Sequence, residues 1–374
     1  MKQLLIIFLL HAVAACSNTS PTGNVAFLKR VADIHGDILS QWTPVRQVSV
    51  HLLDPATGQK LATTQTNNEG NYSFGEIALP TNFRVEIEAR ILGPRINVWV
   101  NDGSVDKVPY RTRSDTGKLK IRIEEPYLAG AFNIVDLNLQ LATLMDGLVD
   151  NSPPPKLLEV SWGPNNAPYC GSCYFEDQHL LDLAGTAGEE DGHDDSVVLH
   201  EFGHYVEFTW GLYDNPTGAH NLEYVIPTLA WSEGFATWLQ GAIRQDPIYV
   251  DRRPNESIYS LDLETPPDST KGTLDGQIES KLSEALVYGL LWDLSDAGDG
   301  DDDVADYSRE EVLEVVLALK DGPDLGVGGA DLVDFLNLWQ CAHPSTSDLN
   351  TLHELLMAVD FPYETLPEPL CPST

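Results

Sequence analysis

The amino-acid sequence predicts an α+β protein in which a small β-sandwich precedes a larger, mainly α-helical domain. Three observations support this fold class. Between residues 30 and 125, apolar and polar residues alternate in short runs, which gives a strand one buried and one solvated face. After Pro126 the spacing of the apolar residues becomes partly helical. The chain has 374 residues, enough for two domains that each bury a core.

The composition is that of a packed and strongly acidic protein. Hydrophobic residues make up 42% of the chain, as in globular proteins. Acidic residues outnumber basic ones by 57 to 22, which gives a formal net charge of −35. Nucleic acid and anionic lipid would be repelled by this charge, so neither is expected as a partner.

The N-terminus, MKQLLIIFLLHAVAACS, has the features of a secretory signal. A basic start at Lys2 precedes an apolar run that is too short to span a bilayer. The small residues that lead into Cys16 resemble a bacterial lipobox, which implies a lipid anchor at Cys16. Because Ser17 follows, the resemblance implies an outer-membrane lipoprotein facing the periplasm or the cell surface. Cleavage that leaves a free cysteine is the alternative.

Four cysteines remain after Cys16, namely Cys170, Cys173, Cys341 and Cys371. An even number in an exported protein suggests disulfides, with three possible connectivities. The pairings 170–173 and 341–371, which are local in the sequence, are favoured. The Cys-Gly-Ser-Cys segment has a redox motif or half a zinc knuckle as alternatives, but the chain has no second CxxC and no surrounding βαβ pattern.

Residues 1–16 are expected as the signal peptide, 17–29 as a tether and 30–125 as the β-sandwich. Alternating runs occur at 83–90 and 118–123. Turn-forming residues separate the strands at 54–58, 67–70 and 101–103. Short strands with turns at such intervals predict a sandwich.

Part of this segment resembles the carboxypeptidase regulatory-like (prealbumin-like) domain. That family has a glycine near its start, a D-x-x-T-G turn and a T-x-x-x-G-x-[YF]-x-[FI] segment. The matching residues are Gly36, Asp54, Thr57, Gly58, Thr66, Gly70, Tyr72 and Phe74. The resemblance covers about forty residues and implies an accessory sandwich without catalytic residues.

Residues 126–374 are expected as the second domain. A helix is predicted over 132–148, followed by strands in KLLEVSW and YFEDQHLLDLAG. Ser308 and Glu311 form a capping-box pattern in front of VLEVVLALK. Two more helical stretches follow near 330–342 and 348–358.

The segment VVLHEFGHYVEF, residues 197–208, carries an HExxH motif. Residues four apart share one face of a helix, so His200 and His204 can reach a single ion. Glu201 lies beside the first histidine, where it can act on a water without binding the ion itself. Zinc hydrolases need neutral nitrogen ligands and a base next to the water, and this spacing supplies both. An amphipathic helix with two coincidental histidines is the alternative.

A third ligand is expected from PTLAWSEGFATWLQGAI, residues 227–243. This segment is apolar except for one acid in its middle, Glu233. A carboxylate among tryptophans and alanines is costly to bury without a partner, and zinc would be that partner. A solvent-facing Glu233 is the alternative.

The two segments together resemble the gluzincin metallopeptidases, in which HExxH is followed by a glutamate ligand on a later helix. WSEGFATWL is close to the N-E-G-F-A segment of the aminopeptidase branch, and the plan is that of thermolysin-like enzymes. The resemblance implies a mainly helical catalytic domain, His200, His204 and Glu233 as Zn²⁺ ligands, and Glu201 as general base. The arrangement also looks like uncharacterised bacterial exported lipoproteins.

The chain departs from these families at several positions. Thr237 stands where thermolysin-like enzymes have an aspartate that orients a histidine. The aminopeptidase G-x-M-E-N motif is absent, so an endopeptidase is favoured over an exopeptidase. The metzincin pattern is excluded, because Glu207 and Trp210 stand at its glycine and histidine positions.

An oxyanion in peptide hydrolysis needs a hydrogen-bond donor. Related gluzincins use a tyrosine or histidine for this role, and Tyr288 in KLSEALVYGLLWDL is the expected donor; a core tyrosine is the alternative. His220 is a second candidate, with a solvated loop histidine favoured. Asp194 or Asp195 can orient a ligand histidine, although N-capping is favoured. The acidic loop 299–303 partly matches a calcium loop, but Val304 replaces its glycine and an ordinary solvated loop is favoured.

The sequence therefore predicts a lipid-anchored zinc metalloendopeptidase that hydrolyses peptides or proteins outside the cytoplasm. In the implied mechanism, Glu201 takes a proton from the attacking water and passes it to the leaving amine. The rival hypothesis is a non-catalytic surface lipoprotein that binds protein or carbohydrate and has a structural or degenerate zinc site.

Overall fold

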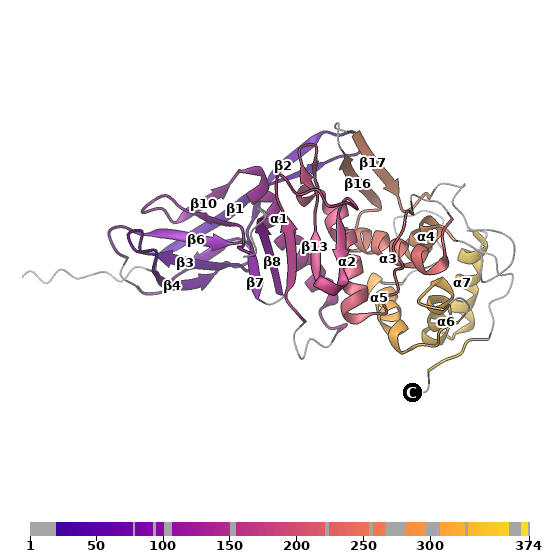
Figure 1. The fold of residues 1–374 in the computed structure, drawn as a ribbon. Helices are drawn as coiled ribbons and strands as arrows, with labels where there is room; N and C mark the ends of the chain where they lie inside the picture. Colours follow the sequence, from indigo (N-terminus) through magenta and orange to yellow (C-terminus); the bar gives the residue numbers. More distant parts are fainter. Residues whose placement is uncertain are drawn as a thin grey trace, which may run out of the picture.

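The computed structural model describes residues 20–372 apart from 78, 93–94, 101–106, 150–154, 221–223, 254–256, 267–281, 297–304, 306, 326–327 and 359–367. The signal peptide, Cys16 and the acidic loop 299–303 lie outside the described residues. The fold mixes sheets and helices, as the sequence predicts. Strands of the N-terminal part occupy one end of the molecule and helices α4 to α7 the other, with helix α1 between them (Figure 1).

Two four-stranded sheets form the N-terminal part. In the first, the order is β10-β1-β2 and β5 also pairs with β1; in the second, the order is β4-β3-β6-β9. The first sheet consists of β1 (Thr22–Ala32), β2 (Ile38–Pro44), β5 (Asn71–Ser73) and β10 (Lys120–Ile123). The second consists of β3 (Ser49–Leu53), β4 (Lys60–Gln65), β6 (Arg84–Glu88) and β9 (Arg111–Arg113). This strand-rich region is consistent with the predicted sandwich.

The alternating pattern explains which residues face the core. Val85 and Ile87 on β6 are fully buried and pair with Leu52 and Val50 on β3. Glu86, which the pattern places on the wet face, is buried as well, because Arg113 on β9 forms an ion pair with it at 2.6 Å. A carboxylate that is paired with a guanidinium can be largely removed from water at a lower free-energy cost.

The predicted tether 17–29 is wrong over most of its length. Strand β1 begins at Thr22, and Val25 and Phe27 are fully buried in the core. The stretch VAFLKRV has the apolar content of a strand, and pairing with both β2 and β10 makes it a central strand of its sheet. The turn-forming residues Ser20 to Gly23 at the start of this strand favour a loop, which is why the sequence did not predict the strand.

A third sheet joins the two predicted domains. Its order is β12-β13-β11-β8-β7, and its central pair is the parallel pair β8 and β11, with Ile96 opposite Leu158. The strands are β7 (Arg90–Leu92), β8 (Arg95–Val100), β11 (Leu158–Trp162), β12 (Cys173–Phe175) and β13 (Leu180–Asp182). The boundary at residue 125 therefore does not separate two independent sheets, because β8 on one side of it pairs with β11 on the other.

Helix α1 (Pro126–Met145) connects the sheets to the helical part. Glu125 caps its start by accepting hydrogen bonds from the backbone N–H groups of Tyr127 and Leu128. Among the described residues it is the one helix that is long and apolar enough to cross a membrane, but most of it is buried inside the fold, as in a core helix. The predicted helix over 132–148 is confirmed, with an earlier start.

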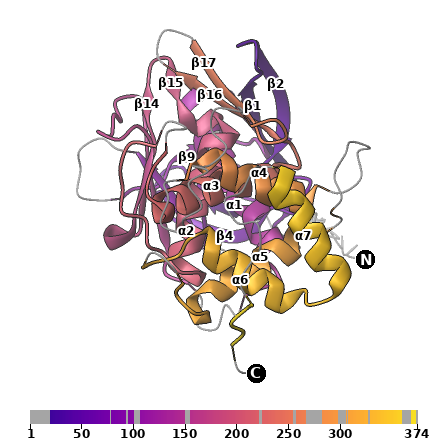
Figure 2. The same ribbon diagram turned by 90° about the vertical axis from the view of Figure 1, so that its right-hand side faces the viewer.

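The remaining helices surround a common apolar core. They are α2 (Asp195–Trp210), α3 (Pro227–Arg244), α4 (Glu284–Ser295), α5 (Arg309–Ala318), α6 (Leu332–Ala342) and α7 (Thr346–Ala358). The predicted capping box of Ser308 and Glu311 is present at α5. Two hairpins accompany the helices: β14 (Gly185–Thr186) with β15 (Glu189–Glu190), and β16 (Ile248–Arg253) with β17 (Ser257–Asp262). The hairpin β16–β17 lies beside β1 and β2 (Figure 2).

The disulfides follow the favoured pairing. Cys170 is bonded to Cys173 and Cys341 to Cys371. The second disulfide ties the end of α6 to the C-terminal segment, where Asn337 also exchanges two hydrogen bonds with the backbone of Leu370.

Candidate metal centre

Helix α2, which carries the HExxH motif, begins at Asp195 and ends at Trp210. Asp194 occupies the N-cap position, and Gly211 ends the helix by donating its N–H to the carbonyl of Glu207. Asp194 makes no side-chain cap hydrogen bond; its carboxylate accepts from the backbone N–H of Arg252 instead. Asp195 forms an ion pair with Lys29. The favoured capping role is thus not observed, and neither aspartate hydrogen-bonds to a histidine of the motif.

His200 and His204 lie on successive turns of α2 and face the same side. The centroids of their rings are 5.0 Å apart. Both residues are buried, with 9% and 6% of their surface exposed. The i, i+4 spacing therefore produces the shared face that a common ligand requires.

Glu233 on α3 completes the cluster. Its Oε2 atom lies 3.2 Å from Nε2 of His200 and 3.4 Å from Nε2 of His204. Its Oε1 atom accepts a hydrogen bond of 2.9 Å from the side-chain amide of Asn215. One carboxylate oxygen is thus held by the protein while the other faces both imidazoles. The alternative interpretation of the sequence, in which Glu233 faces solvent, is wrong, since only 6% of the residue is exposed.

Two glycines allow the helices to approach closely enough for these contacts. A Cβ atom on Gly203 of α2 would lie 2.6 Å from Cα of Ala236 on α3. A Cβ atom on Gly234 of α3 would lie 2.5 Å from Cβ of Val287 on α4. Larger residues would push α2, α3 and α4 apart, so the glycines in HEFGH and SEGF set the distance between the histidines and Glu233.

Hydroxyl groups orient both imidazoles from behind. Nδ1 of His200 lies 3.1 Å from Oγ1 of Thr237, and Nδ1 of His204 lies 3.2 Å from Oγ of Ser232. The Ser232 hydroxyl donates to Oε2 of Glu207 at 2.6 Å, so its oxygen is left to accept from Nδ1–H of His204. Thr237, a departure from thermolysin-like enzymes, thus contacts His200 directly. Both Nε2 atoms are left facing Glu233, as metal ligands require.

Glu201 is buried next to this cluster with an unused oxygen atom. Its Oε2 has no hydrogen-bond partner among the described residues. Burial raises the pKa of Glu201, which makes its carboxylate a stronger base. A buried carboxylate oxygen without a partner is costly and rare, and a water bound beside it would satisfy it.

The donor set and the charge balance fit a zinc ion. One atom from each of His200, His204 and Glu233 lies within 4.8 Å of the others. Two imidazole nitrogens and a carboxylate oxygen are the ligands of many catalytic zinc sites, which keep a further position open. Among the described residues, no lysine or arginine pairs with Glu201, Glu207 or Glu233, and the groups within ion-pair distance of Glu207 and Glu233 are histidines.

His220, the second candidate donor, reaches the cluster. Its Nδ1 lies 2.7 Å from Oε2 of Glu284 on α4, and its Nε2 lies 3.6 Å from Oε2 of Glu233. Burial lowers its pKa, but the carboxylates of Glu284 and Glu233 together raise the pKa of His220 to about 9. Its side chain keeps 36% of its surface exposed, so a ligand from solvent can touch it. The favoured interpretation of a solvated loop histidine is therefore wrong.

Tyr288 is fully buried on α4, one turn after Glu284. Its hydroxyl has no hydrogen-bond partner among the described residues, and burial raises its pKa. Its role stays a prediction. Tyr249 on β16 was not among the residues expected at the site. Its ring lies 6.3 Å from that of His200. Burial, together with nearby carboxylates that include Glu201, raises the pKa of Tyr249. Tyr249 lies in a short strand after the helix of Glu233, and so short a strand has no periodic sequence pattern that would single out this tyrosine.

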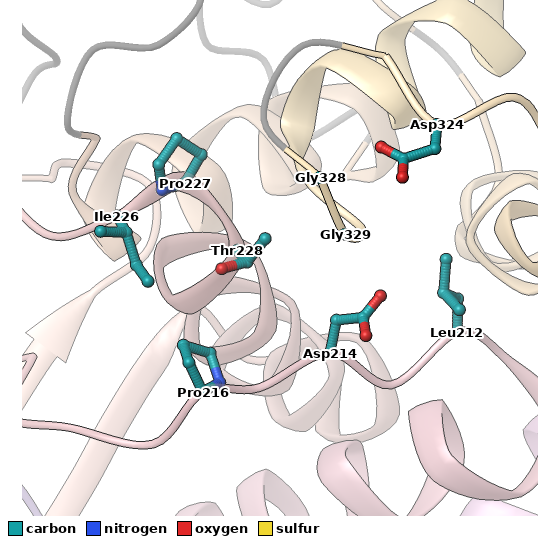
Figure 3. Close-up of a pocket in the computed structure, with 9 residues that line it drawn as sticks. All are labelled: Leu212, Asp214, Pro216, Ile226, Pro227, Thr228, Asp324, Gly328 and Gly329. Carbon is teal, nitrogen blue, oxygen red and sulfur yellow. The ribbon is translucent and has the colours of Figure 1, made fainter.

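A pocket of about 740 Å³ is formed by the loop after α2, the start of α3 and residues near 324–329. It is lined by Leu212, Asp214, Pro216, Ile226, Pro227, Thr228, Asp324, Gly328 and Gly329 (Figure 3). The side chains of Asp214 and Asp324 point into it from different segments (Figure 3). Asp214 is adjacent to Asn215, the residue that holds Glu233, so the pocket and the cluster share one loop.

Comparisons with known proteins cover different parts of the chain. The sequence model of the mycolysin C-terminal domain matches residues 151–347, which contain α2, α3 and α4. No curated protein matches the chain. Among solved structures, the 5-hydroxyisourate hydrolase of Klebsiella pneumoniae is 19% identical, with 27% of this chain and 86% of that chain covered and a TM-score of 0.14. An (S)-allantoin synthase is 12% identical, with 29% and 40% covered and a TM-score of 0.14. At these TM-scores neither structure informs fold or function.

Proposed function

The chain belongs to the mycolysin C-terminal domain family, which is related to metallopeptidases, and from this premise we propose that it is a zinc metalloendopeptidase. One observation carries the proposal: His200, His204 and Glu233 converge on one point, and the unpartnered oxygen of Glu201 lies beside them. His200, His204 and Glu233 would hold Zn²⁺.

Zinc, when bound, polarises the scissile carbonyl and lowers the pKa of the attacking water. Glu201 accepts one proton from that water as the water oxygen attacks the carbonyl carbon. The same carboxyl group then gives the proton to the nitrogen of the leaving amine as the C–N bond breaks. Burial raises the pKa of Glu201, which makes its carboxylate a stronger base for the first of these steps.

His220 donates a hydrogen bond from Nε2 to the developing oxyanion. Hydrogen bonding of Nδ1 to Glu284 fixes the ring and favours the protonated imidazole, which has a proton on both nitrogens. Its partial exposure next to buried Glu233 supports this role, because a substrate carbonyl could reach it from solvent. His220 takes the role for which the sequence had favoured Tyr288, and Tyr288 is retained as the second candidate.

The substrate is a peptide or protein outside the cytoplasm. The secretory signal and the lipobox-like cysteine support export and a lipid anchor at Cys16, on the bacterial outer membrane. The pocket that shares the loop of Asp214 and Asn215 with the cluster would take one substrate side chain. The absence of an aminopeptidase G-x-M-E-N segment favours cleavage inside a chain.

The variant Glu201→Gln tests the function. Both wild type and variant are expected to bind one zinc per chain, because Glu201 is no ligand, while cleavage of a mixed peptide library falls about 10²- to 10⁴-fold in the variant. Glu314→Gln, an exposed acid on α5, is the matched control and keeps full activity. Stoichiometric zinc in wild type without any cleavage would favour a binding protein instead, and unchanged cleavage in Glu201→Gln would remove Glu201 from the mechanism.

A further inference from the structure

A second group of acids, two buried and one half-buried, lies at the start of α2, apart from the two histidines. It contains Asp191 in the 3-10 turn η2 (Asp191–His193), Asp194 at the N-cap of α2, and Asp251 on β16. One carboxylate oxygen from each of the three lies within 4.8 Å of the others. The group therefore joins the turn before the HExxH helix to a strand more than fifty residues later in the chain.

Each of the three carboxylates is fixed by one of its oxygens. Oδ2 of Asp191 accepts from the hydroxyl of Ser172. Oδ2 of Asp194 accepts from the backbone N–H of Arg252 at 3.0 Å, and Oδ2 of Asp251 accepts from Nε of Arg253 at 2.8 Å. Each carboxylate is therefore held in place by a contact of its Oδ2 atom.

For one oxygen of Asp191, the described residues supply no partner. Only 3% of Asp191 is exposed, yet its Oδ1 atom has no hydrogen-bond partner among the described residues. Asp194 is buried to the same degree, and it turns away from the helix N–H groups that an N-cap aspartate ordinarily binds. Asp191 therefore keeps one buried oxygen without a partner among the described residues, and Asp194 gives the helix no side-chain cap.

The charges around the group are not balanced. The guanidinium of Arg252 pairs with Glu190, and Lys29 pairs with Asp195. Of the described basic residues, Arg253 is the one that pairs with the group, through Asp251. Burial raises the pKa of Asp191 well above its ordinary value and that of Asp194 to about 7. The hydrogen bond from Ser172 to Asp191 and the contacts of Arg252 with Asp194 oppose this rise, and neighbouring carboxylates add to it. A bound cation would remove this cost without protonation.

We propose that Asp191, Asp194 and Asp251 bind a calcium ion that ties the turn before α2 to strand β16. Carboxylate oxygens without nitrogen or sulfur donors suit a hard cation rather than zinc. Ca²⁺–O distances of about 2.3–2.6 Å allow two ligands of one ion to lie up to roughly 5 Å apart, in line with the spacing here. Water and backbone carbonyls fill the remaining positions.

The burial of the group distinguishes an ion from a larger cation. Asp191 and Asp194 are each 3% exposed, which leaves no room for a lysine or arginine side chain of a substrate. The site acts on the fold, since it holds the first turn of the helix that carries His200 and His204. This inference is independent of whether the protein cleaves peptides.

Terbium luminescence tests the site on the zinc-loaded full chain. Tb³⁺ replaces Ca²⁺ at oxygen sites and is excited by a nearby indole, and the ring of Trp162 lies against Gly192, next to Asp191. Sensitised emission is expected to saturate at one Tb³⁺ per chain, and Ca²⁺ is expected to displace it at concentrations at least tenfold lower than Mg²⁺. Equal displacement by the two ions would overturn the assignment to calcium.

Variants locate the ion. Asp191→Asn and Asp251→Asn are each expected to weaken Tb³⁺ binding at least tenfold and to abolish the rise in melting temperature that Ca²⁺ gives the wild type. Asp115→Asn, an exposed turn residue, and Asp301→Asn, in the acidic loop, are the controls and keep both responses. If Asp191→Asn fails to fold, Asp251→Asn decides. Wild-type behaviour in Asp251→Asn, or loss in Asp301→Asn alone, would overturn the proposal.

Discussion

Two regions of the helical part bury carboxylates in different ways. At the start of α6, Asp331 and Asp334 form a capping box, and their oxygens accept from the backbone N–H groups of Asp331, Val333, Asp334 and Leu325. At the metal centre, Glu233 is held by an amide side chain, Glu207 by a hydroxyl, and Glu201 has an unpartnered oxygen. Backbone groups hold the first pair, although Oδ2 of Asp331 has no partner among the described residues, whereas side chains hold Glu233 and Glu207 of the second set.

The two regions also differ in what can neutralise a buried carboxylate. Burial, and then the proximity of Asp334, raises the pKa of Asp331 to about 7, so this carboxyl group can take up a proton. The metal centre has two imidazoles within reach of its carboxylates, a set that suits an ion. A buried acid next to histidines is therefore a better indication of a binding site than a buried acid on a helix cap.

The strongest test of this contrast is Glu233→Ala. Zinc affinity is expected to fall more than about 100-fold, because removing a ligand costs more than removing a group that merely orients one. Peptide cleavage should fall with it, while circular dichroism stays unchanged. The matched variant Asp331→Ala should keep zinc and lose stability by about 1 kcal/mol, as expected for a lost helix cap. Retention of one tightly bound zinc by Glu233→Ala would break the comparison.

His220→Ala separates binding from catalysis within the metal centre. The proposed oxyanion donor contributes about 10²- to 10³-fold to kcat, so kcat should fall by that factor. Zinc content, measured by elemental analysis, should stay at the wild-type level because His220 is not among the proposed ligands. A loss of zinc together with activity would instead make His220 a ligand. Glu284→Gln, which acts through His220, should have a smaller effect in the same direction.

Thr237→Val tests orientation of a ligand alone. The substitution is nearly isosteric and removes the hydroxyl that lies 3.1 Å from Nδ1 of His200. Zinc affinity should fall about 10- to 100-fold, as for other groups that orient metal ligands, when measured by competition with a chelator. Thr143→Val on α1, whose hydroxyl bonds to the carbonyl of Leu139, is the control and should leave the affinity unchanged. Equal affinities in the two variants would show that Thr237 has no part in the site.

The pH dependence of stability tests the α6 region. The folded-state pKa of Asp331, about 7, lies above its ordinary value of 3.8. The protonated group therefore contributes its full stability below about pH 4, and this contribution is lost as the pH rises through 7. An asparagine at this position can still cap the helix, so Asp331→Asn should match the wild type at pH 5 and exceed it at pH 8 by on the order of 2 kcal/mol. Urea unfolding at pH 5 and pH 8 measures the free energy of unfolding of both proteins. The same difference between them at the two pH values would contradict a raised pKa for Asp331.

Local patterns in the sequence predicted much of what the structure contains. The HExxH spacing fixes which face of α2 carries both histidines, and the single acid in an apolar helix identifies Glu233 as buried. A four-residue pattern was enough to predict the capping box of Ser308 and Glu311, and the structure contains it. These features depend on helical periodicity or on short-range hydrogen bonds, which are legible along the chain.

Features that depend on contacts distant in the sequence were not predicted. His220 lies in a loop, and its partner Glu284 is 64 residues away. Glu284 does share a signal with Glu233, since it begins an otherwise apolar helix, but an acid in a first turn is common for electrostatic reasons alone. Tyr249, Asp191 and Asp251 come together only when the hairpin β16–β17 packs against α2. No local rule specifies that packing.

The pairing of β8 with β11 affects how the protein folds and how it can be divided. The paired residues Ile96 and Leu158 are 62 positions apart, so the sheet closes only after a large loop has been ordered, which slows folding. A shortened chain that begins at residue 126 would keep the HExxH helix but leave β11 with an open edge towards the missing β8. Exposed edges of buried strands promote aggregation. The N-terminal strand-rich region therefore cannot be removed as a detachable module, because its strand β8 pairs with β11 of the peptidase-related half.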